Sequence, residues 1–216
     1  DLQDFLKKVN QDLPGIMELE LEYYCPRGLF ISDESGKGVK KRYALIDEED
    51  ELIIKGFEFV RGDWSEISKE TQYQVFNALL KDKDEEKAIK VVKEIIKDLK
   101  DNKIPLSKLV IRKQLTRDVD KYKSIGPHVA VAKRLKEKGY PISGGTMIEY
   151  VVTEGKGLIR EKANTVEEIK EQDLKPDAEY YTQRQIIPSI ERVLTALNVN
   201  KGELEGREQK GLKDYI

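Results

Sequence analysis

The stretch VKKRYALIDEEDELIIKGFEFVRGDW, from Val39 to Trp64, decides the fold of this chain of 216 residues. Aromatic, apolar and β-branched residues fill the second half of Lys40–Ile46 and most of Leu52–Phe57, and the acidic run Asp47–Asp50 separates the two segments. This pattern predicts two antiparallel strands joined by a turn. A basic turn and the start of a long helix follow.

The first of these strands carries three cations and one aromatic residue, Lys40, Lys41, Arg42 and Tyr43. Strand side chains alternate, so Lys41 and Tyr43 should share one face and Lys40 and Arg42 the other. Cations beside an aromatic residue on a rigid element suit a nucleic-acid backbone. The alternative is a solvated edge strand whose charges prevent aggregation, and the pattern alone leaves both interpretations open.

Upstream, the spacing of apolar residues predicts a helix over Asp1–Asp12. Met17, Leu19 and Leu21 then alternate with three glutamates, which predicts a strand, and Arg27–Ile31 predicts another. Glu18, Glu20 and Glu22 would stand about 7 Å apart in a row, which favours a solvated face over a metal site. The first sixty residues thus hold about four short strands and one helix. They would bury little core alone, so we expect strands of a partner to complete the sheet.

Downstream, helix signals dominate. Asp63 with Glu66 suggests a capping box before one helix, and Asp84 suggests the cap of a second, antiparallel helix. A strand is expected at Met147–Val152, with Leu158–Ile159 as its partner. Further helix starts are expected at Gly126-Pro127, at Thr165 with Glu168, and at Asp177, with a kink at Pro188.

The helix that opens at Gly126-Pro127 has a second possible role. Its first turn presents free N–H groups and the positive end of the helix dipole, with Lys123 and His128 beside it. A phosphate could bind there without any readout of base sequence. The alternative is an ordinary junction between a loop and a helix.

Four segments carry a resemblance to a known family: KKRYALIDE, VRGDWSEISKETQ, TRDVDKYKSIGPHVAVAKRLKEKG and DAEYYTQRQIIPSIERVL. In this order and spacing they resemble the C-terminal part of archaeal family B DNA polymerases, from about Leu13 to the end of the chain. The resemblance implies an α+β fold. Residues 1–60 would form part of a palm subdomain with a short antiparallel sheet and a helix, residues 61–200 a mainly helical thumb, and residues 201–216 a flexible tail.

The resemblance also implies which residues contact DNA. Lys41 and Tyr43 match the Lys-x-Tyr motif of the family, which holds the primer strand near its 3′ end. Gln209, Leu212, Tyr215 and Ile216 match a tail that binds the sliding clamp, although such a tail could instead fold back onto its own domain. The full set expected to contact DNA is Lys40, Lys41, Arg42, Tyr43, Arg61, Thr116, Arg117, Tyr122, Lys123, Gly126 and His128.

Departures from the family refine the expected function. Gly62 stands where the family usually has a second arginine, and Ser32–Val39 is an extra polar loop. The Asp-Thr-Asp motif and the second metal-binding aspartate motif are missing. The chain therefore resembles the smaller polypeptide of a split polymerase. We expect it to hold no catalytic residue, metal or cofactor of its own, and to be inactive alone.

The expected partners follow from that resemblance. A large polymerase polypeptide would hold two Mg²⁺ ions on its aspartates, and primer-template DNA and a sliding clamp would bind as well. The reaction would be DNA-directed nucleotidyl transfer. Two rival hypotheses remain: a DNA-binding or clamp-tethering module that works without a catalytic partner, and a purely structural thumb-like protein.

Composition limits the alternatives. The net charge is −2, so any DNA contact requires cations gathered on one face. One cysteine excludes an internal disulfide, and one histidine argues against a histidine-based metal site. No apolar run approaches about 18 residues and no signal-peptide pattern opens the chain, so we expect no membrane contact and a cytoplasmic location. Abundant Lys and Glu resemble a thermophile composition.

Overall fold

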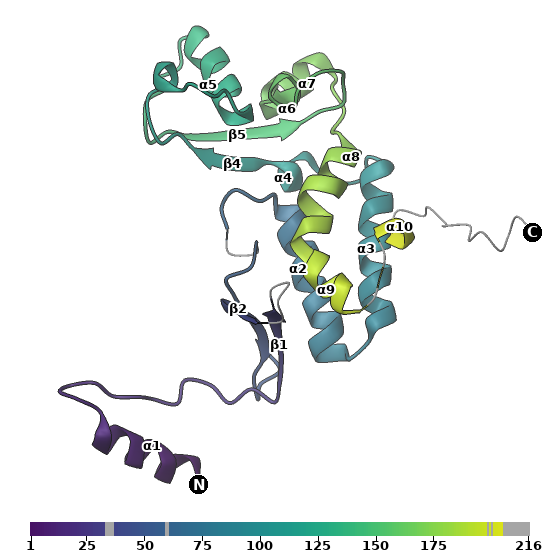
Figure 1. Cartoon of the computed structure of the whole chain (residues 1–216). Coiled ribbons are helices and arrows are strands. Elements are labelled where there is room, and N and C mark those ends of the chain that lie inside the picture. Colours follow the sequence, from purple (N-terminus) through teal and green to yellow (C-terminus); the bar gives the residue numbers. More distant parts are fainter. Residues whose placement is uncertain (33–36, 59–60, 198, 200, 205–216) are drawn as a thin grey trace, which may run out of the picture.

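The computed structural model describes residues 1–32, 37–58, 61–197, 199 and 201–204. It has an α+β fold with two small antiparallel sheets, as the sequence predicts. Figure 1 shows a central body of helices, with one sheet at each end and the N-terminal helix held away from the body on an extended segment.

The first sheet has the strand order β1-β2-β3, with β1 at Arg27–Ser32, β2 at Gly38–Ile46 and β3 at Leu52–Lys55. Both hairpins are antiparallel, and Ala44 at the centre pairs with Leu29 on one side and Ile54 on the other. The buried side of this sheet meets the helical body through Phe57, whose ring lies 4.8 Å from that of Phe76. The two predicted strands around the turn at Asp47–Asp50 are therefore confirmed.

The strand predicted at Met17–Leu21 is wrong. Helix α1 (Leu2–Asp12) forms as expected, with Asp1 as its N-cap, but the residues that follow are extended without a strand partner. The side-chain amide of Asn10 replaces a strand partner at Leu19, because it accepts from the Leu19 N–H at 2.8 Å and donates to the Leu19 carbonyl at 2.9 Å. Alternation predicts a strand only if a neighbour supplies the ladder, and the described part of this chain supplies none.

The helical body consists of five segments. They are α2 (Glu66–Asn77), the π-helical turn η2 (Ala78–Asp82), α3 (Glu85–Lys100), a second π-turn η4 (Thr182–Ile186) and α9 (Ile187–Ala196). Helices α2 and α3 pack together and α9 lies against α2. Asp84 caps α3 by accepting from the Lys87 N–H at 2.8 Å, as predicted.

The prediction that Asp63 caps α2 is wrong. Ser65 holds the N-cap position, and the Asp63 carboxylate is bound by Arg61 instead. The backbone N–H of Ser65 donates to the side chain of Gln185 at 2.9 Å, which ties the start of α2 to η4. Gln185 lies in the wide turn just before Pro188. Proline has no N–H and its ring displaces the carbonyl four residues earlier, so the predicted disturbance of this helix takes the form of a π-turn.

The second sheet has the strand order β4-β5-β6, with β4 at Ile111–Gln114, β5 at Met147–Val152 and β6 at Ala163–Asn164. The predicted partner of β5, Leu158–Ile159, is wrong, because these residues lead into a short helix, α6 (Ile159–Lys162). Helices α5 (Pro127–Glu137), α6 and α7 (Val166–Gln172) lie over this sheet in Figure 1. We call this sheet with these helices the β4–β5 lobe.

Short elements join the lobe to the helical body. They are α4 (Leu106–Leu109) and α8 (Ala178–Tyr181), whereas the 3-10 turn η3 (Val119–Lys121) packs against α5 inside the lobe. Tyr181 is fully buried at this joint, where its hydroxyl donates to the Leu109 carbonyl at 2.6 Å and accepts from the Val152 N–H at 3.1 Å. At the far end of the chain, α10 (Lys201–Leu204) packs on α3 with Leu204 buried. The first residues of the predicted tail thus contact the body.

Candidate nucleic-acid interface

Lys41 has a left-handed backbone in the middle of β2, with φ at 63°. The pairing between β1 and β2 passes from Phe30↔Tyr43 to Ser32↔Gly38, so residues 39–42 bulge out opposite Ile31. We call these residues the β2 bulge. The left-handed conformation costs a side-chain-bearing residue on the order of 1–2 kcal/mol. The strict alternation predicted for this strand is wrong here, because the bulge interrupts the pleat.

The four predicted DNA contacts of β2 differ in their surroundings. Lys40 and Lys41 are exposed at the bulge, whereas Tyr43 is half-buried with its ring 6.1 Å from that of Phe30. Arg42 is engaged inside the chain. Its Nε donates to the Gly56 carbonyl at 3.0 Å, and its Nη2 pairs with Glu58 at 2.5 Å. Lys40 and Lys41 are therefore better placed than Arg42 to reach a phosphate.

Arg61 lies between the first sheet and α2. Its guanidinium makes a two-pronged contact with Asp63, at 2.9 and 3.1 Å, and lies 6.0 Å above the ring of Trp64. The bond to Asp63 raises the pKa of Arg61. Burial alone would raise the pKa of Asp63, but the bond from Arg61 outweighs it and the pKa is lowered. A phosphate contact by Arg61 would have to compete with this pair.

A second group of predicted residues gathers around the start of α5. The Tyr122 hydroxyl accepts from the Thr116 N–H at 2.8 Å, and the Arg117 guanidinium lies 5.4 Å from the Tyr122 ring. His128 meets that ring edge-on, with the two ring centres 6.1 Å apart. We call Thr116, Arg117, Tyr122, Gly126 and His128 the α5 cluster. The structure thus brings together residues that lie up to twelve positions apart in the sequence.

Gly126 and His128 form the N-terminal end of α5. Gly126 is the N-cap, Pro127 is the first helical residue as predicted, and no side chain caps this end. A Cβ at Gly126 would lie 3.3 Å from the His128 ring, so a larger residue at this position would crowd the ring. The His128 Nδ1 is buried and has no hydrogen-bond partner among the described residues. Burial lowers the pKa of His128, and the charge of Lys113 lowers it further.

Lys113 is a neighbour of this cluster that sequence reasoning missed. It lies on β4, exposed, next to two other polar residues, and nothing in that local pattern separates it from an ordinary solvated strand. Its charge acts on both His128 and Asp63. Within the described residues no carboxylate comes within ion-pair distance of a set of exposed cations, namely Lys40, Lys41, Lys113, Arg117 and Lys123.

The first sheet and the β4–β5 lobe lie at different ends of the helical body in Figure 1. Charged residues connect the β2 bulge with the α5 cluster, because Arg42 pairs with Glu58, Arg61 pairs with Asp63, and the charge of Lys113 acts on both Asp63 and His128. Four residues predicted to bind a clamp lie outside the described part of the chain, namely Gln209, Leu212, Tyr215 and Ile216, and so do residues 33–36 of the extra loop.

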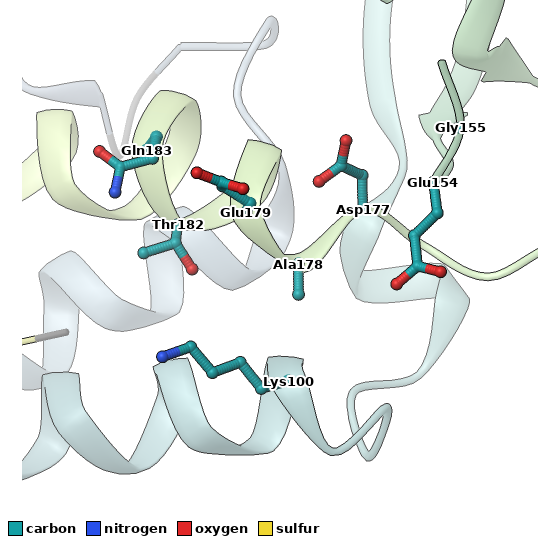
Figure 2. Close-up of a pocket in the computed structure, with 8 residues that line it drawn as sticks. All are labelled: Lys100, Glu154, Gly155, Asp177, Ala178, Glu179, Thr182 and Gln183. Atoms are coloured by element: carbon teal, nitrogen blue, oxygen red, sulfur yellow. The ribbon is translucent and has the colours of Figure 1, made fainter. Parts of the chain in front are cut away.

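A hollow of about 510 Å³ near the joint of α3 and α8 has the wrong charge for DNA. Figure 2 shows three carboxylates around it, those of Glu154, Asp177 and Glu179. Asp177 is already engaged, because it accepts from the Tyr180 N–H at 2.8 Å and pairs with Lys162 at 2.6 Å. Acidic side chains repel phosphates, so this hollow is not part of the interface.

The carboxylates of the described residues do not assemble a metal site. No group of three or more His, Cys, Asp or Glu side chains lies close enough there to hold an ion. Glu18, Glu20 and Glu22 stand exposed along the extended N-terminal segment. A search of the described helices finds none that combines the length and the apolar composition needed to cross a bilayer.

Comparison with known proteins places this architecture in a family. The family model described as DNA polymerase family B matches residues 6–197. DNA polymerases of Thermococcus kodakarensis and Thermococcus gorgonarius are both 46% identical to this chain over 99% of its length, and that of Pyrococcus horikoshii is 44% identical over 99%. The structure of the family B DNA polymerase from the hyperthermophilic archaeon Pyrobaculum calidifontis aligns with 92% of the chain at a TM-score of 0.72 and 32% identity.

The chain belongs to DNA polymerase family B. It spans 12%, 27% and 17% of the length of the three relatives named above, and 25% of the Pyrobaculum chain. The resemblance to archaeal family B polymerases is thus confirmed. The Lys- and Glu-rich composition, which resembles that of thermophile proteins, agrees with a structural relative from a hyperthermophilic archaeon. Because the chain covers so small a part of these relatives, the activity of a whole polymerase is not assigned to it directly.

Proposed function

We propose that this chain is the part of a family B DNA polymerase that grips primer-template DNA, formed by the end of the palm and the thumb. The observation that carries the proposal is a set of exposed cations, Lys40, Lys41, Lys113, Arg117 and Lys123, that have no ion-pair partner among the described residues. Lys41 at the β2 bulge would hold the primer strand near its 3′ end. The α5 cluster with Lys113 and Lys123 would hold the duplex backbone further along. Contacts of this kind fix position without reading sequence, as copying any template requires.

The catalytic metal ions of the proposed reaction would be held elsewhere. Polymerase chemistry uses two metal ions on carboxylates, and the described residues offer no such group. The metal-ligating side chains of the described residues are too scattered to hold these two ions, so no chemical step is assigned to this chain. We propose that a partner polypeptide supplies the aspartates, and that this chain keeps the primer end in place. A misplacement of about 1 Å at a reacting centre can lower a rate by about 100-fold.

The N-terminal region supports a partner of that kind. The outer strands β1 and β3 leave both edges of the first sheet without a neighbour among the described residues. On the extended segment that precedes β1, the apolar residues Ile16, Met17, Leu19 and Leu21 are each at least 47% exposed. Apolar alternation beside open strand edges suits the addition of strands from another polypeptide. The large polymerase polypeptide is the partner that this proposal requires.

Salt-dependent DNA binding tests the grip. Fluorescence anisotropy with a labelled primer-template would be measured for the wild type, for Lys41→Ala and for Lys93→Ala, a control that removes an exposed lysine of α3. Each lost phosphate contact lowers the slope of log affinity against log salt by about one unit. We expect that decrease for Lys41→Ala alone. Equal slopes for both variants would remove Lys41 from the interface.

Primer extension tests the partner. The chain would be mixed with the large polymerase polypeptide of the same organism, and extension would be compared with that by either chain alone. We expect extension that depends on both chains and falls for Lys41→Ala. Strong DNA binding without any effect on extension would favour the rival hypothesis of a DNA-binding or clamp-tethering module.

A further inference from the structure

We infer that Gly56 and Glu58 are positioning residues, which lock the β2 bulge to the helical body and so aim the Lys41 side chain. The role of Lys41 toward DNA rests on the proposed function; the lock itself rests on contacts inside the chain. Nothing in the local sequence around Gly56 or Glu58 indicates such a role.

The first part of the lock is a close contact between two backbones. Gly56 has a φ of 69° and lies against Lys41, whose own φ is 63°. A Cβ at Gly56 would stand 1.8 Å from the Lys41 carbonyl oxygen and 2.8 Å from its carbonyl carbon. Backbone atoms cannot move aside as the end of a flexible side chain can. Only glycine therefore allows the backbone just after β3 to lie this close to the bulge and to hold Lys41 in its left-handed conformation.

The second part is the side chain of Arg42, the residue after Lys41. It reaches back across the bulge, where Nε donates to the Gly56 carbonyl at 3.0 Å and Nη2 pairs with the Glu58 carboxylate at 2.5 Å. Its guanidinium also lies 5.5 Å from the ring centre of Phe57. A planar guanidinium held from three sides leaves the peptide between Lys41 and Arg42 little freedom to turn.

The third part connects Glu58 to the helices. Glu58 is 8% exposed, and its second oxygen accepts from the Gln72 Nε2 of α2 at 3.3 Å. Gln72 is fully buried, and the same nitrogen donates to the Ser189 carbonyl of α9 at 2.5 Å. A continuous polar chain thus runs from the bulge to two helices of the body. Buried polar groups that satisfy one another in this way hold their elements in one arrangement.

The lock gives Lys41 a defined position relative to α2 and α9 of the helical body. Without the Glu58 charge, Arg42 would be a half-buried cation without a counterion and would turn toward water. The bulge could then relax to an ordinary strand, because a left-handed lysine persists only where its surroundings enforce it. Lys41 would keep its charge but lose its direction.

Hydrogen exchange measured by mass spectrometry tests the lock without DNA. Glu58→Gln should speed exchange in peptides that cover Val39–Tyr43 by about tenfold or more, the factor that corresponds to one lost hydrogen bond to a charged group. Glu70→Gln is the matched control, since Glu70 is a carboxylate of α2 that pairs with Lys108 at 2.7 Å instead of with Arg42. Unchanged exchange at Val39–Tyr43 in Glu58→Gln would overturn the inference. Peptides from α5 should exchange alike in all three proteins.

A double-mutant cycle with primer-template tests whether the lock acts through Lys41. Glu58→Gln alone should flatten the salt slope by about one unit, as Lys41→Ala does, and should add nothing in the Lys41→Ala background. Additive losses would show that Glu58 does not act through Lys41, which contradicts the inference. If exchange rises in Glu58→Gln while Lys41→Ala leaves the slope unchanged, the lock stands and the proposed DNA role of Lys41 fails.

Gly56→Ala provides an independent variant of the same test. It disturbs the backbone contact and leaves every charge in place, so loss of DNA affinity cannot come from a changed net charge. We expect the exchange and the salt slope to change as in Glu58→Gln. A Gly56→Ala protein with native exchange at the bulge would refute the backbone part of the lock.

Discussion

Replacing Glu168 by glutamine should destabilise the chain by about 2–3 kcal/mol at pH 7 and by less than half of that at pH 3. The side chain of Glu168 is 6% exposed and accepts from Arg134 at 2.9 Å and from Lys138 at 3.0 Å. It also closes the capping box of α7 by accepting from the Thr165 N–H at 3.0 Å. This carboxylate therefore holds α5 and α7 together in the β4–β5 lobe.

The magnitude follows from the pKa of the carboxyl group. Burial alone would raise the pKa of Glu168, but the bonds from Arg134, Thr165 and Lys138 outweigh it and lower the pKa from 4.5 to about 2. That difference corresponds to about 3 kcal/mol of stability. Because the folded-state pKa is depressed, this stability is present above the ordinary pKa and is lost as the pH falls from about 4.5 toward 2. Glutamine can keep the cap bond, so the expected loss is somewhat smaller.

Urea unfolding followed by far-UV circular dichroism at pH 7, 5, 4 and 3 would measure the effect. Glu149→Gln is the control, because Glu149 pairs with Arg112 at 2.7 Å while both side chains are half exposed. Exposed pairs of this kind contribute at most about 1 kcal/mol, so the control should differ little from the wild type. A loss for Glu168→Gln equal to that of the control, or one that does not change with pH, would refute the reasoning.

Three further predictions concern single groups. Tyr181→Phe should lower the free energy of unfolding by about 2–3 kcal/mol, because it leaves the Leu109 carbonyl and the Val152 N–H buried without their partner. Urea titration would measure this loss, and a loss below about 0.5 kcal/mol would show that the Tyr181 hydroxyl does not stabilise the joint. Asp84→Ala should cost about 1 kcal/mol by the same measurement, since it removes the cap of α3. Burial and Lys113 lower the pKa of His128, so it should gain its charge only as the pH falls below its ordinary 6.5. The salt slope of DNA binding should then steepen by about one unit in the wild type and not in His128→Gln; identical slopes at acidic pH would exclude a phosphate contact by His128.

Features that depend on a few neighbouring residues were predictable from the sequence. The caps at Asp84, Thr165 and Asp177 are confirmed, because an N-cap side chain and the N–H it binds lie within three residues of each other. The start of α5 at Gly126-Pro127 and the β2–β3 hairpin follow from equally local signals. The cap predicted at Asp63 failed because Arg61 competes for the same carboxylate.

Features that depend on distant partners were not predictable. The alternation at Met17–Leu21 suits a strand, but a strand also needs a neighbour that local sequence cannot show. The bulge at Lys41 depends on Gly56 and Glu58, which lie fifteen or more positions further along the chain. In the α5 cluster, the sequence pointed to Tyr122 and His128. It did not point to Lys113, because the β4 pattern gives no sign that this strand ends beside the cluster.

The π-turn at Thr182–Ile186 holds one residue more than an α-helical turn, because its hydrogen bonds join residues five apart instead of four. The wide turn absorbs this residue locally, so Tyr181 can bind the β4–β5 lobe while Ile190 stays buried in the helical body. Within a regular α-helix, by contrast, each residue turns the chain by about 100° and advances it by about 1.5 Å. Deleting one residue from Thr182–Ile186 should consequently be tolerated better than deleting one from the middle of α9.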